Sequence, residues 1–400
     1  MLLNRERALA VMEELDLDAL VATQAENVYY LSDYFTEHLY HFGPGGFAGA
    51  ILPRDEQLPA TLILQEWELP QLTKRPTWMP QLRVLTGFDV YAPDEASLGP
   101  TETALLEMVR EGRKTGSPNR QRALGATLQE LGLANGRLGF DEASTRNELS
   151  ENELADATLV DAVNVFRRIR SVKTPDEVTL LRHAAKINQT ALEGVRNIVD
   201  VGVTPRELMR YYRSAMAEQG GYGSHMTGGG GAHPWLSHPD MSYEFKRGDV
   251  IYLDPAGHYR RYWADVGRAA IVGEATAKFE ERNGRLQDCH REVVPMITAG
   301  ASSTAITDAA ARSVADHMPG GFVPLIHSIG LEHYDQPQSL GTFLSEDFTI
   351  EEGMVVNFET LYFELGWGLL QFENTYVVGS GEPERVQTLP MEPFVCPTAP

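Results

Sequence analysis

Two β-prone runs that each contain a single aspartate constrain the fold more than any other feature of this sequence. The stretch DVIYLDPAGHYRRYWADVGRAAIVG, residues 249–273, has Asp254 in its first apolar run and Asp265 in its second. An unpaired carboxylate in an apolar interior is costly unless it gives up its charge. A hairpin turn centred between Tyr259 and Arg260 places the two aspartates directly opposite each other. Two carboxylates that face each other across a hairpin repel unless they share a proton or a cation.

A second hairpin near the C-terminus repeats the pattern with glutamates. In MVVNFETLYFELGWGLLQFENTYVV, residues 354–378, a turn centred on Gly366 pairs Glu359 with Glu373. One opposed acid pair is equally well explained by chance, by an exposed hairpin face or by a bulged register. Two matched pairs favour convergence. Four converging carboxylates require hard divalent cations, and two ions are the simplest solution.

One of the eleven histidines lies in a context that suits a metal ligand. His327 ends the apolar run GGFVPLIH and precedes the turn-prone SIG, where a side chain can point into a cleft. The alternative is an ordinary hydrogen-bonded histidine. Most of the others, including His225 in GYGSHMTGGGG, lie in flexible, helical or surface-like contexts and are expected to be solvated or hydrogen-bonded.

Composition limits the classes of partner and compartment. The 400 residues, 42% of them hydrophobic, are enough for two domains. A net charge of −22 disfavours nucleic acid and anionic membranes as partners. The only cysteines, Cys289 and Cys396, cannot build a disulfide framework, which fits a reducing cytoplasm. The N-terminal residues have the pattern of a charged amphipathic helix and not of a signal peptide, and no apolar run is long enough to span a membrane.

The pattern of predicted elements changes near residue 170. The N-terminal part is predicted to contain both helices and strands, with a helix over 4–16, a buried strand over 18–23 and an aromatic strand and turn over 27–35. Thr174, Pro175 and Glu177 then form a capping box that opens a long helix. We therefore expect an α/β domain over residues 1–168 and a second domain over residues 169–400.

These motifs together resemble a known family. An aspartate followed by Ala-Gly, a second aspartate followed by Val-Gly-Arg, the HSIGLE turn, a Met-Val-Val strand ending in glutamate and the late FEN are similar to the pita-bread metallopeptidases. These include Xaa-Pro dipeptidase (prolidase), Xaa-Pro aminopeptidase (aminopeptidase P) and methionine aminopeptidase. The resemblance implies an α+β fold with an N-terminal domain like those of creatinase and prolidase. It also implies a C-terminal catalytic domain in which helices flank a curved antiparallel sheet.

The resemblance further implies a site for two divalent metal ions. Its ligands would be Asp254, Asp265, His327, Glu359 and Glu373, with Asp265 and Glu373 bridging both ions. Asp254 would complete one site, and His327 with Glu359 the other. Mn²⁺ is the first expectation, with Co²⁺, Fe²⁺ and Zn²⁺ as alternatives that tolerate the same ligands. The ions would activate water to attack an amide bond, and Glu359 could accept the proton of that water.

The family also has two outer histidines that steady the substrate. His238 is the candidate ahead of the first metal strand, with His233 as its rival. The second would be His333, although it follows His327 by six residues where the family usually has seven.

Several neighbours of the ligands depart from the peptidase pattern, which leaves the substrate open. They are Pro255, Ser328, Thr360 and Asn374. The first expectation is a homodimeric hydrolase that cleaves a dipeptide, with proline after the scissile bond, or a peptide-like amide. The alternative is a small-solute enzyme on the same fold, either a C–N hydrolase of the creatinase or ectoine-hydrolase type or a C–S lyase acting on dimethylsulfoniopropionate. A non-enzymatic binding module is disfavoured because all five ligands are present.

Overall fold

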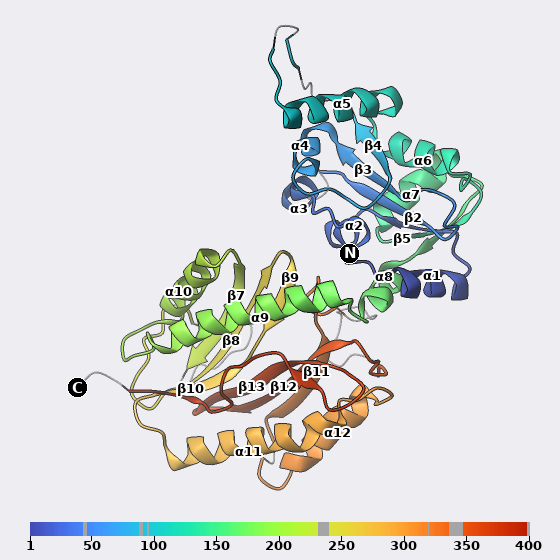
Figure 1. The fold of residues 1–400 in the computed structure, drawn as a ribbon. Coiled ribbons are helices and arrows are strands. Elements are labelled where there is room, and N and C mark those ends of the chain that lie inside the picture. Colours follow the sequence, from blue (N-terminus) through green and yellow to red (C-terminus); the bar gives the residue numbers. More distant parts are fainter. Residues whose placement is uncertain are drawn as a thin grey trace. The chain divides into compact units, whose positions relative to one another are not determined.

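The computed structural model describes residues 1–42, 46–87, 91–93, 96–230, 240–318, 320–335 and 347–397. The chain divides into two compact units, Met1–Arg170 and Ser171–Pro400, which are drawn in Figure 1. This division rests on spatial contacts, and the domain boundary expected between residues 168 and 169 stays a prediction.

The N-terminal unit is built on a mixed six-stranded sheet in the order β4-β3-β2-β1-β5-β6. Strand β2 is antiparallel to both β1 and β3, and the remaining pairs are parallel. The strands are β1 (Ala19–Ala22), β2 (Gly49–Pro53), β3 (Thr61–Gln65), β4 (Gln81–Leu85), β5 (Arg137–Phe140) and β6 (Thr158–Asp161). The α-helices are α1 (Arg5–Glu14), α2 (Ala25–Ser32), α3 (Glu37–Phe42), α4 (Leu69–Leu72), α5 (Pro100–Thr115), α6 (Arg120–Glu130), α7 (Ala143–Asn152) and α8 (Val163–Arg170).

The mixed α/β character of this unit agrees with the sequence analysis, but one expected strand is wrong. Residues 27–35 were expected to form an aromatic strand, and most of them belong to the helix α2. Val28, Tyr29, Tyr30 and Leu31 are all buried in it. A buried helix is apolar on all sides, so its sequence shows no 3.6-residue period and resembles a β-prone run.

A buried carboxylate ties the loop after β1 to the end of β5. Asp141 accepts hydrogen bonds from the backbone N–H groups of Thr23 (2.8 Å) and Gln24 (3.0 Å) and from the Asn27 amide (2.9 Å). The Thr23 hydroxyl adds a fourth bond at 3.1 Å. Burial raises the pKa of Asp141 to about 6, and these hydrogen bonds oppose that rise. The carboxylate thus satisfies several buried donors at once.

Replacing Asp141 with alanine is expected to lower the free energy of unfolding by about 3 kcal/mol, because the buried donors lose their acceptor. Urea denaturation of the full chain would measure this loss. The exposed Asp156 provides the matched control, and Asp156→Ala is expected to stay within about 0.5 kcal/mol of the wild type. Equal denaturation midpoints for the two variants would contradict the structural role of Asp141.

The C-terminal unit contains two mainly antiparallel sheets between two pairs of helices (Figure 1). The first sheet has β7 (Tyr222–Gly230), β8 (Val250–Tyr259), β9 (Tyr262–Asp265), β10 (Arg268–Val272) and β15 (Phe394–Cys396). The second has β11 (Phe322–Ser328), β12 (Val355–Glu364), β13 (Gly368–Val377) and β14 (Glu384–Arg385). Helices α9 (Pro175–Arg196) and α10 (Pro205–Glu218) pack on one side, and α11 (Ala277–Val293) and α12 (Ser303–Val314) on the other.

The two sheets adjoin along β8, β10 and β13. The backbone N–H of Glu373 in β13 donates to the carbonyl of Gly267, which lies between β9 and β10 (3.1 Å). One apolar core lies under α11 and α12, and a second under α9 and α10. The expected arrangement, an antiparallel sheet flanked by helices, is confirmed. The predicted capping box is present too, since Glu177 accepts from the N–H of Thr174 (2.8 Å) and Thr174 from that of Glu177 (3.2 Å).

The register of the first hairpin differs from the expected one. Asp265 lies opposite Ala256 and not opposite Asp254, because the chain reverses one residue later than predicted. The turn consists of Arg260 and Arg261, both with positive φ (47° and 71°), as a two-residue type I′ turn requires. The two aspartates are diagonal neighbours on one face of the hairpin, since side chains alternate with a period of two.

The second hairpin has the predicted register, and Glu359 pairs directly with Glu373. Gly366 lies in the turn with a φ of 78°, a conformation that glycine adopts without strain. Across the described residues, none of the helices is both long enough and apolar enough to cross a membrane.

Candidate metal centre

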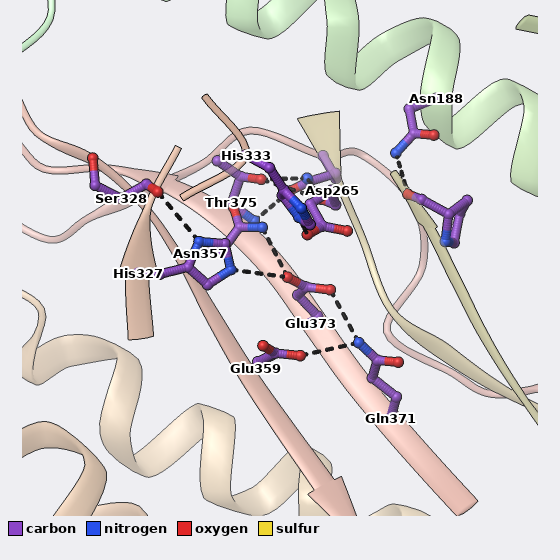
Figure 2. Close-up of polar contacts among 12 residues, drawn as sticks. Asn188, Asp265, His327, Ser328, His333, Asn357, Glu359, Gln371, Glu373 and Thr375 are labelled. Atoms are coloured by element: carbon purple, nitrogen blue, oxygen red, sulfur yellow. Dashed lines mark hydrogen bonds and ion pairs between the residues drawn. The ribbon is translucent and has the colours of Figure 1, made fainter. Parts of the chain in front are cut away.

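The five residues expected to bind metal converge from five strands. Asp254 lies in β8, Asp265 ends β9, His327 lies in β11, Glu359 in β12 and Glu373 in β13. Figure 2 shows four of them, His327, Asp265, Glu359 and Glu373, whose side chains point toward one another. Side-chain ligand atoms of His327, Glu359 and Glu373 lie within 4.8 Å of one another, and so do those of Asp254, Asp265 and Glu373. Glu373 therefore belongs to both groups.

The four carboxylates are crowded and mostly buried, although Asp254 is partly exposed. Burial, reinforced by the other carboxylates, raises the pKa values of Glu359 and Glu373 well above their ordinary range. Burial also acts to raise the pKa of Asp265, but the neighbouring His333 outweighs it and holds this pKa below the usual value. The repulsion among carboxylates in such a mostly buried site is relieved by bound protons or by a cation.

His327 presents an unprotonated nitrogen to this cluster. Its Nδ1 lies 3.2 Å from the carbonyl oxygen of Ser328, which can only accept, so Nδ1 carries the hydrogen and Nε2 keeps its lone pair. Burial, followed by the charge of His333, lowers the pKa of His327 to about 4. A neutral imidazole whose second nitrogen is fixed by a hydrogen bond is a suitable metal ligand.

Two buried atoms of the cluster have no hydrogen-bond partner among the described residues, Nε2 of His327 and Oδ1 of Asp265. Buried polar atoms are normally satisfied, so atoms without a hydrogen-bond partner in an acidic cluster suit the binding of a cation. Four carboxylates and one imidazole form a donor set that divalent ions such as Mn²⁺, Fe²⁺, Co²⁺ and Zn²⁺ accept. The residues present therefore fit divalent metal.

Two side-chain amides orient the carboxylates of Glu359 and Glu373. The Asn357 amide donates to Oε1 of Glu373 (2.8 Å), and the Gln371 amide donates to Oε2 of Glu359 (3.1 Å) and of Glu373 (3.2 Å). Both amides are buried. Gly267 leaves room for Gln371, because a Cβ there would lie 2.5 Å from Cγ of that side chain. These contacts fix the directions in which the carboxylates present their oxygens.

Replacing Gln371 with leucine is expected to weaken metal binding by about 10- to 100-fold, because both glutamates lose the donor that orients them. Titration of metal-free protein with Mn²⁺ would measure the dissociation constant without requiring a substrate. The exposed Gln219 in the same unit is the matched control, and Gln219→Leu should bind metal as the wild type does. Unchanged affinity in Gln371→Leu would contradict an orienting role.

His333 lies beside the acidic cluster in the segment that follows β11. Its Nε2 contacts Oδ2 of Asp265, and its ring stacks on Trp263 with centroids 5.3 Å apart. Ligand atoms of Asp265, His327 and His333 also come within 4.8 Å of one another. Burial acts to lower the pKa of His333, and the charge of Asp265 outweighs it and raises this pKa. His333 is therefore placed at the site despite its unusual spacing from His327.

Three residues near the site were not anticipated from the sequence. His225 lies in β7 opposite Ala256, and its ring centroid is 5.5 Å from that of His333. Tyr334 places its ring 4.2 Å from that of His327, and Trp263 stacks on His333. Gly-rich surroundings made His225 look solvated, although pairing of its strand with β8 could have indicated its position. The two candidates for the outer histidine, His233 and His238, lie outside the described residues.

Comparison with known proteins agrees with this geometry. Residues 179–380 match the model of metallopeptidase family M24, and residues 4–172 match the creatinase/prolidase N-terminal domain. The chain is 22% identical over 388 residues to the Xaa-Pro dipeptidase of Pyrococcus furiosus, covering 95% of this chain and 96% of that one. It is 25% identical over 282 residues to the uncharacterised peptidase YqhT of Bacillus subtilis, covering 66% and 76% of the two chains.

Among solved structures, an Xaa-Pro dipeptidase from Bacillus anthracis superposes with a TM-score of 0.76 at 19% identity, covering 98% of both chains. The fold and the convergent acids define a two-domain metallohydrolase of the pita-bread type. The chain belongs to metallopeptidase family M24. Membership of this family makes it an enzyme, a metal-dependent peptidase.

Proposed function

We propose that this protein hydrolyses Xaa-Pro dipeptides, or closely similar amides, with two divalent metal ions, of which Mn²⁺ is the first candidate. The observation that carries the proposal is the convergence of four carboxylates and one imidazole in two groups that share Glu373. The Xaa-Pro dipeptidase among its relatives supports the substrate class.

The proposed roles follow from the two groups. Asp254, Asp265 and Glu373 would hold one ion, and His327, Glu359 and Glu373 the other, with Asp265 also reaching the second. Bound divalent metal lowers the pKa of water and polarises a carbonyl oxygen. Glu359 would accept the proton of the attacking water, since its carboxylate lies in the same ligand group as His327 and Glu373. The buried position of Glu359 keeps competing water away from that proton.

His333 is proposed to steady the substrate beside the cluster. Its ring is held between Asp265 and Trp263 and faces His225. We keep His238 as the proposed second outer histidine, on the sequence argument alone. His225 lies opposite Ala256, which itself pairs with Asp265, so its imidazole is on the face of the sheet that carries Asp265. His225 is therefore the alternative candidate for that role.

A small cationic solute is the second candidate substrate. Trp263, Tyr334 and the rings of His327 and His333 form a cluster of aromatic faces beside the acids. Aromatic faces attract quaternary ammonium and related cations. This observation keeps a C–N hydrolase or C–S lyase activity on the same fold as the alternative.

A substrate panel separates the two candidates. Purified protein loaded with Mn²⁺ would be tested with Gly-Pro, Ala-Pro and Leu-Pro, and in parallel with creatine, ectoine and dimethylsulfoniopropionate. Release of free proline from at least one dipeptide is the expected result. Turnover of a solute with no release of proline would overturn the dipeptidase proposal in favour of the alternative.

We also propose that the protein is a cytoplasmic homodimer. Cys289 and Cys396 are both buried free thiols, which supports a reducing compartment. The resemblance to two-domain relatives supports the dimer. Light scattering after size-exclusion chromatography should give twice the mass of one chain, and the mass of a single chain would contradict the dimer.

A further inference from the structure

A fully buried ion pair lies next to the proposed site without belonging to its ligand set. Nζ of Lys173 is 3.5 Å from Oδ2 of Asp335, and both side chains have 0% of their surface exposed. Removing two charges from water is unfavourable, and their mutual attraction compensates for this only when the geometry is good. In some proteins, an arrangement of this kind specifies one conformation in place of others.

Lys173 holds both ends of the segment that carries His333. Its Nζ donates to the hydroxyl of Ser328 (3.2 Å), at the end of β11, and pairs with Asp335 seven residues later. The backbone N–H of Asp335 also donates to the carbonyl of Ser328 (3.0 Å), so the segment is closed as a loop. His333 and Tyr334 lie immediately before the anchored Asp335.

Lys173 itself is held firmly in place. Its backbone N–H donates to the carbonyl of Gly353 (2.9 Å), just before β12, the strand that carries Glu359. The next residue caps α9, and Glu177 in the first turn of that helix is a second carboxylate whose charge acts on Lys173. Glu177 is fixed in turn by the hydroxyl of Tyr262 in β9 (3.1 Å). These contacts fix the position of Lys173 relative to helix α9 and to strands β12 and β9, which carry Glu359 and Asp265.

The loop between Ser328 and Asp335 is tightly packed at Gly330. A Cβ on Gly330 would lie 2.2 Å from Oδ2 of Asp335 and 3.2 Å from Cε of Lys173. The Gly330 carbonyl accepts from the N–H of Trp263 (2.8 Å), the residue whose ring stacks on His333. The same short loop therefore touches the ion pair on one side and Trp263 on the other.

We propose that Lys173 and Asp335 are positioning residues that set the ring of His333 against Asp265 and Trp263. The buried ion pair, together with the hydrogen bond from the Asp335 N–H to Ser328, anchors the end of the loop two residues beyond His333. Without it, the loop keeps its apolar contacts but loses the constraint that fixes the direction of the imidazole. The effect on turnover rests on the proposed function, whereas the effect on the His333 ring does not.

The test uses full-length variants Asp335→Asn and Lys173→Met/Asp335→Leu. The single variant leaves Lys173 beside the second carboxylate, Glu177, and the double variant removes both charges of the pair, so the double variant remains informative if the single variant fails to fold. The matched control is Arg182→Ala/Glu384→Ala, which removes an exposed ion pair (2.7 Å) that also links α9 to a later strand. Turnover of Ala-Pro, Mn²⁺ content and thermal midpoint would be measured for each.

We expect a 10- to 100-fold loss of kcat with KM changed less than about threefold, unchanged metal content and, for the double variant, a thermal midpoint near that of the wild type. The control should keep kcat within twofold. Wild-type kcat in a folded double variant would overturn the proposal.

A second readout does not depend on substrate. Histidine ring signals of Zn²⁺-loaded protein, assigned to His333 by their loss in His333→Gln, should shift in the double variant and stay in place in the control. An unshifted His333 signal would overturn the proposal even if the wild type cleaves none of the dipeptides. A shifted signal without dipeptide turnover would count against the proposed function alone.

Discussion

Replacing Glu373 with glutamine is expected to reduce kcat/KM by at least about a thousandfold, equivalent to about 4 kcal/mol of transition-state stabilisation. Glu373 is the carboxylate common to both ligand groups, and it pairs directly with Glu359. Glutamine keeps the shape of the side chain but removes its charge. Both proposed ions would lose an anionic ligand in a single substitution.

Stability measurements distinguish this loss from misfolding. Without metal, burial raises the pKa of Glu373, and the charges of Asp265, Glu359 and Asp254 raise it further. Removing one charge relieves that repulsion, although the new amide group then faces a buried donor of Asn357 or Gln371. Because these effects oppose each other, metal-free Glu373→Gln should unfold near the midpoint of metal-free wild type. Its thermal midpoint should no longer rise when Mn²⁺ is added.

The exposed Glu382 serves as the matched control. Glu382→Gln is expected to retain wild-type turnover, wild-type Mn²⁺ uptake and the metal-dependent rise of the thermal midpoint. If Glu373→Gln also behaved in this way, the shared-carboxylate interpretation of the site would be wrong.

The accuracy of the two predicted hairpins depended on their turn residues. Gly366 marks the second turn, so the register that pairs Glu359 with Glu373 was correct. In the first hairpin, positive φ values fall on Arg260 and Arg261, although such turns favour glycine, asparagine and aspartate. Nothing local marked these residues, and the predicted reversal was one residue too early. Despite this error in register, Asp254 and Asp265 still lie on one face of the hairpin, because diagonal neighbours share a face.

Other parts of the site depend on contacts that no local pattern reveals. Gln371 reaches Glu359 and Glu373 only because β12 and β13 pair and because Gly267 leaves space. The ion pair between Lys173 and Asp335 joins residues 162 positions apart. The acids were predictable because burying them conflicts with their charge. Their supporting residues are ordinary in type and acquire a role only through tertiary packing.

The error at residues 27–35 has a related cause. Tyr29, Tyr30 and Val28 have high β propensity, yet they form the buried helix α2. Propensity is a weak local preference that packing overrides when a segment is enclosed on all sides. Strands β8 and β12 were easier to recognise, because their acids interrupt otherwise apolar runs.

Removing metal with a chelator is expected to reduce activity to about 1% or less of the starting rate, and adding Mn²⁺ should restore it. It should also lower the thermal midpoint. A ligand that binds only the folded state stabilises it by about 2.7 kcal/mol at a hundred times its dissociation constant. For a unit of this size, that corresponds to a rise of about 5–10 °C.

The direction of this thermal shift follows from the charges in the site. Chelation leaves four carboxylates in one largely buried cluster, with the imidazole of His327 held neutral by burial. The metal-free fold therefore carries repulsion that divalent cations remove. Parallel additions of Mn²⁺, Co²⁺, Fe²⁺ and Zn²⁺ at equal free concentration would rank the ions by midpoint and by rate. Because affinity follows ligand type whereas turnover requires the correct geometry, the ion that stabilises most need not be the one that activates most. If neither the thermal midpoint nor the reaction rate changed when chelator or metal was added, the protein would catalyse a reaction that does not depend on a metal ion.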